Sequence, residues 1–393
     1  MRILVAPDVF KGSLSARTAA AIIRKGIKRA IPGANVDILP LADGGEGTVE
    51  ALSEAWGAEP HETVVSGPDG KPVRAAWALT SDEGRGSVST AVLEAASAVG
   101  FALVPERGRD PLRLSSYGLG ELILHAAEAD PKTILVGLGD SATNDCGLGL
   151  AVALGYALSR EDGSLITRDC IFSGSLTEIM GAVHSIGRKP EGIRGHVRSV
   201  VVLADVSNPL LGERGATAVY GPQKGLNPAL VDTVESLVRR FAGIVRRDVR
   251  DVDPMRPGAG AAGGLGFALS VFLGAEIRPG AEYILEACSF RSHAALADVV
   301  VTGEGCLDEQ SLRGKAVSAV AAACAELGKP CLVIAGRVKG NRAEWEEKFG
   351  LMRLYSTIET PGEEVPSTLP PAAERLESAA ERMALELMKA FGL

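Results

Sequence analysis

Residues 1–40, MRILVAPDVF KGSLSARTAA AIIRKGIKRA IPGANVDILP, decide the fold class of this chain. The run ILVA predicts a short buried strand, and Ser15 is suited to cap the helix that follows it. Helical spacing gives that helix an apolar face made of Ala19, Ile22, Ile23, Ile27 and Ala30. Pro32-Gly33 ends the helix, and residues 35–39 predict a second strand. The order strand, helix, strand indicates a parallel β-α-β unit.

The same alternation of strand and helix patterns continues along the chain. Apolar β-branched runs precede helical patterns in TILVGLG, VVVLADV, DVVVTGEG and KPCLVIAG, which begin at Thr133, Val200, Asp298 and Lys329. Composition changes around residues 61–86 and again near 254–266. We therefore predict two α/β domains. Residues 1–62 plus 286–393 would share one doubly wound parallel sheet, residues 63–285 would form a mixed α/β domain, and the active site would lie in the cleft between them.

Composition and charge exclude several classes of protein. With 393 residues, a net charge of −8 and a pI near 5.4, the chain lacks the cationic field that nucleic acids and anionic membranes attract. No apolar run approaches the ~20 residues that span a bilayer, and no signal peptide opens the sequence. The six Cys form no CxxC pair and the five His are dispersed, which disfavours a His-based zinc site. We expect a soluble, cytoplasmic protein with reduced thiols and no nucleic-acid or membrane partner.

Two polar clusters follow the first two predicted strands. PDVFKGSLSA, residues 7–16, puts Asp8 and Lys11 ahead of a helix N-terminus, where free N–H groups and the helix dipole favour an anion. LADGGEGTVEAL, residues 41–52, brings Asp43 and Glu46 among glycines, with Thr48 as a possible cap of the next helix. The alternative for both segments is an ordinary turn whose charged side chains are solvated.

Two further clusters follow the strands in the middle of the chain. GLGDSATNDCGLG, residues 137–149, supplies Ser141, Thr143 and Asn144 in a loop of small residues that could cradle a phosphate or carboxylate. Helix capping by Asn144 or Asp145 is the competing interpretation. Residues 204–225 then offer Asp205 and Asn208, a pair of hard-oxygen donors suited to Mg²⁺, and Lys224 in a turn.

The last two clusters resemble known nucleotide-binding motifs only in part. GAGAAGGLG, residues 258–266, includes Gly263 and Gly264 and formally contains GxGxxG, but no strand pattern precedes it as a dinucleotide fingerprint requires. A nicotinamide-dependent dehydrogenase therefore stays only an alternative. VVVTGEGCLDEQSLRGK, residues 299–315, carries Glu304, Asp308, Gln310 and Lys315, yet its spacing is not that of a P-loop.

Together these clusters supply what phosphoryl transfer needs. Glycine-rich loops can cradle phosphates, lysines can stabilise developing negative charge, and carboxylates can hold Mg²⁺ or accept a proton from the attacking hydroxyl. Most of the clusters stand where a predicted strand ends, so a parallel sheet would bring them to one edge. The protein-kinase HRD and DFG signatures are missing, so a kinase of this sequence would have another architecture.

In order along nearly the entire chain, PDVFKGSLSA, LADGGEGTVEAL, GDSATND, DVSNPL, YGPQKG, GAAGGLG and TGEGCLDEQSLRGK resemble the bacterial glycerate kinase family of type I. The resemblance implies a kinase that uses ATP and Mg²⁺ to convert D-glycerate to 2-phosphoglycerate. It also implies two α/β domains, one of them flavodoxin-like. We expect a monomer or a homodimer. Transfer to the 3-hydroxyl or to another small hydroxy acid, and a non-catalytic sugar-acid-binding protein, are the alternatives.

The sequence departs from the family's usual pattern at four positions. Val9 stands where Ser is common, Asp140 where Gly usually precedes SATND, Cys146 where Gly is usual, and Cys306 where a basic residue commonly lies. Asp140 adds negative charge to an expected anion loop, and Cys306 removes a cation. Arg337, after the last predicted strand, could replace that cation, although a solvated arginine is the simpler interpretation.

Each candidate residue receives an expected role. We expect Asp308 to act as the base, with Asp43 as the second choice, and Lys11 and Lys315 to contact the transferred phosphoryl group or the substrate carboxylate. Asp205 and Asn208 are the predicted magnesium ligands. The remaining residues are predicted to bind substrate or phosphate: Asp8, Glu46, Ser141, Thr143, Asn144, Lys224, Gly263, Gly264, Glu304 and Gln310.

Overall fold

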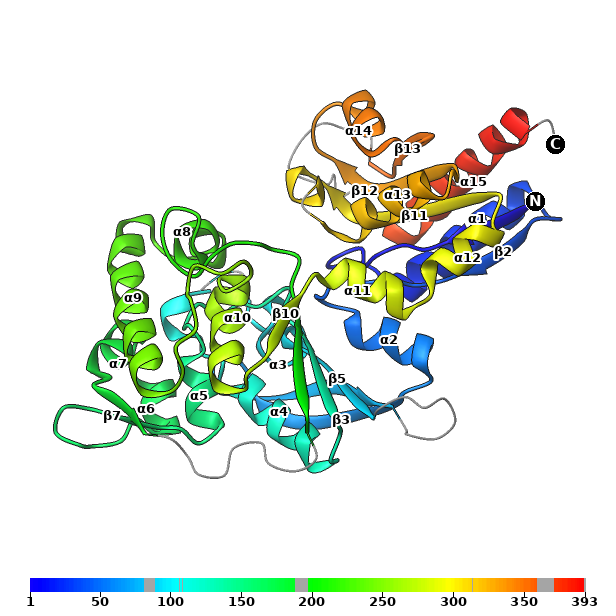
Figure 1. Cartoon of the computed structure of the whole chain (residues 1–393). Coiled ribbons are helices and arrows are strands. Elements are labelled where there is room, and N and C mark those ends of the chain that lie inside the picture. The colour runs from blue at the N-terminus through cyan, green and yellow to red at the C-terminus, as the bar shows by residue number, and fades with distance from the viewer. Residues whose placement is uncertain are drawn as a thin grey trace. The chain divides into compact units, whose positions relative to one another are not determined.

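The chain forms two compact units, labelled by their helices and strands in Figure 1. This computed structural model describes residues 1–80, 89–105, 107, 109–187, 197–312, 314–358 and 371–391. The first unit comprises Met1–Asp43, Glu50–Ala55 and Gly280–Leu393, and the second comprises Gly44–Val49 and Trp56–Pro279. The domain boundaries given above, and the cleft expected between the domains, stay predictions.

The first unit contains a five-stranded, fully parallel sheet. Its order is β13-β12-β11-β1-β2, and the strands are β1 Arg2–Val5, β2 Asn35–Ile38, β11 Val299–Leu307, β12 Cys331–Val338 and β13 Arg353–Ser356. Numbered within the unit, this is the flavodoxin-like order 2-1-3-4-5. The predicted doubly wound sheet is therefore confirmed. The strand order reverses between β1 and β11, which is where such sheets place ligands.

Helices cover both faces of this sheet. Alternate residues of β12 belong to two different cores, one on each face of the sheet. Leu332 and Ile334 join the core beneath α1 Ala16–Ala30 and α15 Ala372–Phe391. Val333 and Ala335 join the core beneath α13 Ala316–Glu326 and α14 Arg342–Phe349. The remaining helical elements of the unit are α2 Thr48–Trp56, whose first two residues belong to the second unit, α11 Gly280–Ala287, α12 Phe290–Leu296 and η5 Glu309–Leu312.

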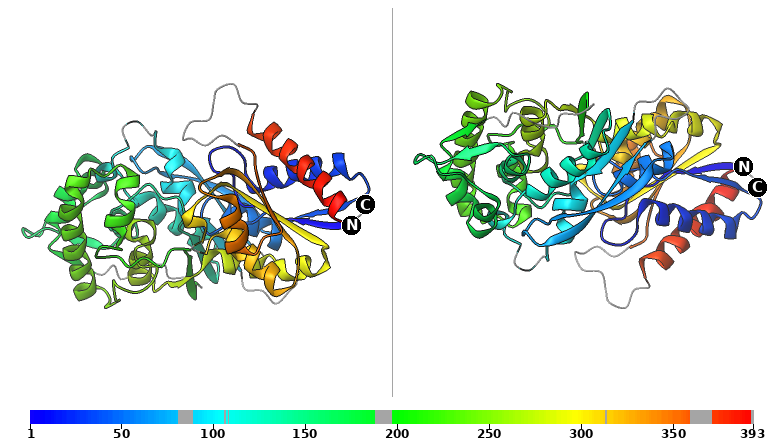
Figure 2. Two further views of the ribbon diagram at one scale, coloured as in Figure 1. Left: turned by 90° about the horizontal axis from the view of Figure 1, so that it is seen from above. Right: turned by 90° about the horizontal axis from the view of Figure 1, so that it is seen from below.

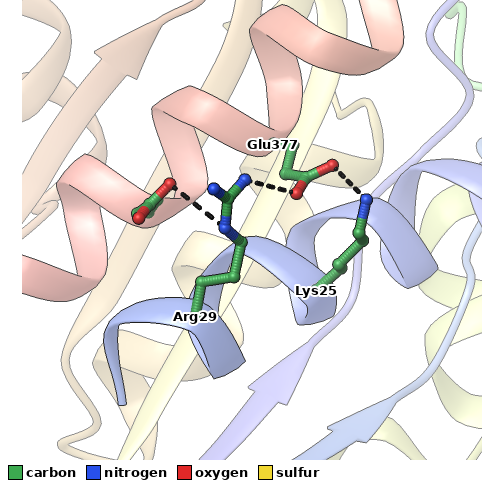
Figure 3. Close-up of polar contacts among 4 residues, drawn as sticks. Lys25, Arg29 and Glu377 are labelled. Carbon is green, nitrogen blue, oxygen red and sulfur yellow. Dashed lines mark hydrogen bonds and ion pairs between the residues drawn. The ribbon is translucent and has the colours of Figure 1, made fainter. Parts of the chain in front are cut away.

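The C-terminal helix is the cover for the sheet that its amphipathic pattern indicates. Figure 2 shows α15 lying along α1, and a Cβ at Gly26 of α1 would lie 2.5 Å from the carbonyl oxygen of Glu377. Beside this close approach, Glu377 accepts hydrogen bonds from Lys25 at 2.7 Å and Arg29 at 2.9 Å (Figure 3). Such exposed ion pairs contribute little, so the apolar contact carries most of the stability of this helix pair.

The predicted start of α1 is also confirmed. The Ser15 hydroxyl accepts a hydrogen bond from the Thr18 N–H at 3.3 Å, and Ser15 has extended backbone angles, as an N-cap residue does. Lys28 and Arg29 lie in the last turn, where positive charge is favourable to the helix dipole. Local sequence chemistry therefore accounts for both ends of this helix.

The second unit is built on a mixed six-stranded sheet of order β10-β9-β6-β5-β4-β3. These strands are β3 Glu59–Ser66, β4 Pro72–Leu79, β5 Thr90–Glu94, β6 Thr133–Gly137, β9 Ser199–Leu203 and β10 Glu276–Arg278. The pairs among β5, β6, β9 and β10 are parallel, while β3 and β4 pair antiparallel at the edge. A small antiparallel pair joins β7 Ala157–Ser159 to β8 Ser185–Gly187. The mixed α/β class predicted for this part is confirmed.

One apolar core runs through the second unit and contains Leu93, Val136 and Val202 from three adjacent strands. The helices of the unit are α3 Ala95–Val99, α4 Tyr117–Glu128, α5 Leu148–Ala153, α6 Arg168–Ser173, α7 Leu176–Ala182, α8 Ala216–Tyr220, α9 Val231–Asp248 and α10 Ala261–Phe272. Short 3-10 turns are η1 Phe101–Leu103, η2 Pro111–Arg113, η3 Pro222–Lys224 and η4 Pro228–Leu230. Across the described parts of both units, no helix is long and apolar enough to cross a membrane.

Candidate functional site

The first unit gathers its candidate residues at the carboxyl ends of its parallel strands. Asp8 and Lys11 follow β1, Asp43 follows β2, and Glu304 lies near the end of β11. The Asp8 N–H donates to the Gly303 carbonyl oxygen at 2.8 Å, which joins the loop after β1 to β11. This contact lies between β1 and β11, where the strand order reverses, so the residues occupy the expected ligand position of the sheet.

Two glycines of the TGEG sequence allow this close approach. A Cβ at Gly303 would lie 2.1 Å from the carbonyl oxygen of Ile334, and one at Gly305 would lie 3.0 Å from the backbone nitrogen of Lys11. Any larger residue would therefore push the neighbouring strand or the loop away. The glycines on either side of Glu304 keep its carboxylate next to the Asp8 and Lys11 loop.

The carboxylates of this group act on one another. The Asp8 side chain is 4% exposed, and this burial, followed by the negative charge of Asp43, holds the pKa of Asp8 well above its usual value. Burial also raises the pKa of Glu304 to about 7, against the hydrogen bond from Ser311 and the charge of Lys315, which lower it. We name Asp8, Asp43 and Glu304 the carboxylate group. It suits a proton acceptor or the neighbourhood of a cation.

The remaining predicted residues of the first unit surround this group. Lys11 is exposed, and Lys315 immediately precedes α13, whose first N–H groups can bind an anion. Asp308 Oδ2 lies 3.7 Å from Lys339 Nζ, and its side chain is 28% exposed. The side chain of Gln310 lies outside the described part of the chain. Of the two residues expected to act as base, Asp308 is thus paired with a lysine, while the charge of Asp43 raises the pKa of both Asp8 and Glu304.

The second unit brings Ser141, Thr143 and Lys224 together. The Lys224 Nζ donates to Ser141 Oγ at 3.1 Å and to the Thr143 carbonyl oxygen at 2.6 Å. Lys224 is 3% exposed, and burial lowers its pKa to about 7, although the charge of Asp145 raises it. Lys224 therefore supports the loop 137–147 from within the unit, and it lies in a short 3-10 turn, in keeping with the turn that the sequence suggested.

Two buried polar atoms of this loop have no hydrogen-bond partner within the described chain: Thr143 Oγ1 and Asn144 Oδ1. Asn144 uses its other amide atom, Nδ2, to donate to Thr217 Oγ1 at 3.2 Å. Buried polar groups without partners are costly and often mark places where a ligand or water binds. These two atoms could receive a ligand, and the predicted phosphate or carboxylate cradle stays a prediction.

Asp145 settles the competing interpretation of the same loop. Its carboxylate accepts N–H groups from Ser116 at 2.8 Å, Gly147 at 3.1 Å and Gly149 at 3.1 Å, and it accepts the Ser116 hydroxyl at 2.8 Å. Helix capping and loop support are therefore its tasks. Asn144 instead bonds to Thr217 of α8, and the anion cradle expected of this segment stays a prediction.

The glycine-rich segment 258–266 folds onto this loop. Ala262, Gly263 and Gly264 have positive φ angles of 54°, 68° and 94°, and they form an irregular start to α10. A Cβ at Gly263 would lie 2.2 Å from the Thr143 carbonyl oxygen, and the Cys146 N–H donates to the Gly263 carbonyl oxygen at 3.0 Å. The glycines therefore bring two loops into contact, and no strand leads into them as a dinucleotide fingerprint requires.

Two of the residues that depart from the family's usual pattern have positive φ angles. Asp140 has φ 60° and Cys146 has φ 52°, a region that glycine adopts without strain. The Asp140 Oδ2 also accepts the Glu46 N–H at 3.2 Å. The added charge of Asp140 thus supports the segment that carries Glu46, and the positive φ angles explain why glycine suits both positions.

The predicted magnesium ligands follow β9. Asn208 Nδ2 donates to the Arg214 carbonyl oxygen and Oδ1 accepts the Tyr220 hydroxyl, both at 2.7 Å. These bonds hold the amide oxygen in one orientation, with a second lone pair remaining for another partner. No group of three or more His, Cys, Asp and Glu side chains arranged for a metal occurs in the described residues. Asp205 and Asn208 nevertheless fit Mg²⁺ by donor type, because it commonly takes one or two carboxylates with waters and phosphates.

Sequence reasoning missed Glu94, the last residue of β5. Its Oε2 accepts the Val49 N–H of α2 at 3.1 Å. Thr48, expected to cap that helix, is its first residue and donates its hydroxyl to the Gly45 carbonyl oxygen at 2.7 Å. The available signal was a glutamate that ends the apolar run TAVL, a strand-end position like those of the other candidates.

A cavity of about 550 Å³ lies elsewhere in the first unit, among α11, α12 and α13. Leu285, Phe290 and Ala323 are among the side chains that line it. None of the candidate residues belongs to that lining, so the strand-end residues define the candidate site and this cavity does not.

Comparisons with known proteins point to one family. A sequence profile described as the glycerate kinase family matches residues 3–388. The chain is 40% identical to a glycerate kinase of Bacillus subtilis, covering 98% of this chain and 95% of the relative. It is 41% identical to the glycerate 2-kinase of Escherichia coli, covering 86% and 85%. A crystal structure described as a glycerate kinase 2 of Salmonella typhimurium LT2 superposes over 100% of both chains, with a TM-score of 0.77 and 37% identity.

Proposed function

The chain belongs to the glycerate kinase family and is a phosphotransferase, and from this premise we propose that it transfers the γ-phosphoryl group of ATP to the 2-hydroxyl of D-glycerate. The products would be 2-phosphoglycerate and ADP. The name of the Escherichia coli relative supports the 2-hydroxyl as the acceptor.

The observation that carries the proposal is the position of the candidate residues. The carboxylate group ends three strands of the first unit, and the Ser141 to Asn144 loop follows a strand of the second unit. Phosphoryl transfer depends mainly on positioning and on charges placed beforehand, so it requires such groups on rigid elements.

We assign the chemistry of the acceptor to the first unit. Asp308 is the proposed base and Asp43 the second choice, and Glu304 joins them because burial brings its pKa to about 7, near the working pH of a base. Asp8 accepts the Val9 N–H at 2.7 Å, which fixes its carboxylate beside the others. Lys11 and Lys315 would stabilise the negative charge of the transferred phosphoryl group.

Binding of the anionic groups falls to the second unit. The Thr143 hydroxyl and the neighbouring N–H groups would contact phosphate or carboxylate oxygens, with Ser141 and Asn144 beside them, and Lys224 would supply positive charge behind them. Gly263 and Gly264 keep the opposing loop close, and Glu46 lies on the adjoining segment. Asp205 and Asn208 would hold Mg²⁺ directly or through water, and the ion would neutralise phosphate charge when it is bound.

The test is release of ADP by the purified protein with ATP and Mg²⁺ in the presence of D-glycerate, L-glycerate and other small hydroxy acids. D-glycerate should give the highest kcat/KM, and a reaction without acceptor should release ADP at a far lower rate. Equal ADP release with and without every acid would contradict the proposal. Saturable glycerate binding without ADP release would indicate a sugar-acid-binding protein.

A further inference from the structure

Within the second unit, hydrogen bonds hold segment Gly44–Val49 against residues at or just after the ends of two strands. The Val49 N–H donates to Glu94 Oε2 at 3.1 Å, the Glu46 N–H donates to Asp140 Oδ2 at 3.2 Å, and the Gly139 N–H donates to the Gly44 carbonyl oxygen at 3.0 Å. Two of the three acceptors are therefore carboxylates. The attachment uses the ends of β5 and β6, two adjacent parallel strands.

Gly137, the last residue of β6, and Gly139, two residues further on, show how closely the segment fits there. A Cβ at Gly137 would lie 2.5 Å from the Gly44 carbonyl oxygen, and one at Gly139 would lie 2.4 Å from the Gly45 Cα. The segment therefore packs directly against the backbone at Gly137 and Gly139, where neither glycine has a side chain that could fix its position. Glu94 supplies the missing side-chain anchor, because it binds N–H groups at the start of α2, those of Val49 and Gly47.

We propose that Glu94 is a positioning residue for phosphoryl transfer, whose ionised carboxylate anchors Gly44–Val49 and so fixes the direction of Glu46 and of the chain that leads to it. This inference rests on the proposed function. At the start of helix α2, the Thr48 hydroxyl donates to the Gly45 carbonyl oxygen, and the Glu94 carboxylate accepts the Val49 N–H. The Glu94 carboxylate, 45 positions away in the sequence, thus accepts an N–H group of the kind that a local N-cap side chain commonly accepts.

The charge of Glu94 is finely balanced. Burial first, and then the charges of Glu46 and Asp140, raise the pKa of Glu94 to about 7, against the N–H groups of Val49 and Gly47, which lower it. Glu46 belongs to the anchored segment and Asp140 to the loop after β6, so both elements packed on Glu94 present a like charge. The ionised form binds two N–H groups better than the neutral acid does, so the anchor should strengthen as pH rises through 7.

The test compares Glu94→Gln with Glu94→Asp and with Glu128→Gln, a matched substitution at an exposed position of the same unit. Glu94→Gln should lower kcat by about 10- to 100-fold with KM for ATP changed by less than about 3-fold, because misplaced groups reduce turnover more than binding. The acidic limb of the kcat profile that falls near pH 7 should shift in Glu94→Gln and persist in Glu94→Asp. Glu128→Gln should match the wild type.

Hydrogen exchange at the Val49 amide gives a readout that needs no variant to fold. In the wild type, protection corrected for the intrinsic rate should rise about 3- to 10-fold between pH 6 and pH 8. Protection that is independent of pH would overturn the inference, as would Glu94→Gln with wild-type kcat and pH profile. A wild-type protein that phosphorylates no acid would instead refute the proposed function, so the two failures are distinguishable.

Discussion

The candidate residues at the strand ends of the two units differ in the sign of their charged groups. In the first unit, carboxylates accumulate, and Asp43 and Glu304 raise the pKa of Asp8. In the second unit, a lysine is buried against a hydroxyl and a carbonyl oxygen, and burial lowers the pKa of Lys224 to about 7. Each region keeps ionisable groups in an environment that disfavours their charge.

This difference in charge indicates which kind of ligand each region would favour. Carboxylates with raised pKa values gain from a proton or a cation, and a lysine with a lowered pKa gains from an anion. A magnesium ion would suit the carboxylates of the first region, and a phosphate would suit the lysine of the second. Perturbed ionisable groups at strand ends are therefore the feature that separates this candidate site from the ordinary ion pairs of the surface, such as those of Lys25 and Arg29 (Figure 3).

The largest effect is expected from the lysines of the first region. Lys11→Met and Lys315→Met should each lower kcat/KM by about 100- to 1,000-fold, because each would remove a positive charge that stabilises the transferred phosphoryl group. Steady-state ADP release measures this effect. Lys28→Met, at an exposed position of α1, is the control and should leave kcat/KM unchanged. Wild-type kcat/KM in both variants would remove the two lysines from the site.

The second prediction concerns the carboxylate group and pH. Glu304 has its pKa raised from 4.5 to about 7, so between these values the folded protein holds a proton that the unfolded chain has lost. Stability from this group is therefore present at low pH and falls as pH rises toward 7, by about 2–3 kcal/mol. Urea unfolding of Glu304→Gln should show a correspondingly flatter pH dependence than the wild type.

The control for this measurement is Glu344→Gln, an exposed glutamate in the first turn of α14. It should keep the wild-type slope between pH 4.5 and 7. An identical slope in Glu304→Gln and Glu344→Gln would mean that Glu304 titrates normally, and the carboxylate group would lose its special character.

The third prediction is that Lys224, in the second region, gives the free energy of unfolding the opposite pH dependence. Lys224 has its pKa lowered from 10.5 to about 7, so between these values the unfolded chain binds a proton that the folded protein lacks. Stability should therefore rise with pH over this window, and Lys224→Met should abolish the rise. The same substitution leaves Ser141 and Thr143 without their donor and should lower kcat/KM by about 10- to 100-fold.

Lys71→Met is the matched substitution in the same unit, because the Lys71 side chain is 81% exposed. It should preserve both the pH dependence of unfolding and the kcat/KM. If Lys224→Met unfolded with the wild-type pH dependence, the lysine would have to be charged and solvated, and the contrast between the two regions would disappear.

The smallest expected effect tests the backbone of the second region. Cys146 has φ 52° and is fully buried, so Cys146→Val places a β-branched residue where the left-handed conformation is strained. We expect a loss of about 1–2 kcal/mol in the free energy of unfolding, measured in urea. Cys146→Gly, which adopts this φ freely, should lie close to the wild type, and equal losses in both variants would argue against backbone strain.

Local chemistry made part of the molecule predictable. The Ser15 cap, the apolar face of α1 and the strand runs depend on neighbouring residues, so the parallel sheet of the first unit and the mixed class of the second follow from the sequence. Glu94 was missed because its partner Val49 is 45 positions away, and the burial of Lys224 depends on residues more than 80 positions away. Asp140 and Cys146 show a third limit, since a positive φ angle leaves no mark on a single sequence.

The most direct test of the central claim is proton-coupled ³¹P NMR of the product made from ATP and D-glycerate. Transfer to the 2-hydroxyl places the phosphate next to one C–H, so the account predicts a new doublet, together with the signals of ADP. A triplet would place the phosphate on the 3-hydroxyl beside a CH₂ group. Inorganic phosphate and ADP as the only new products would contradict phosphoryl transfer to glycerate altogether.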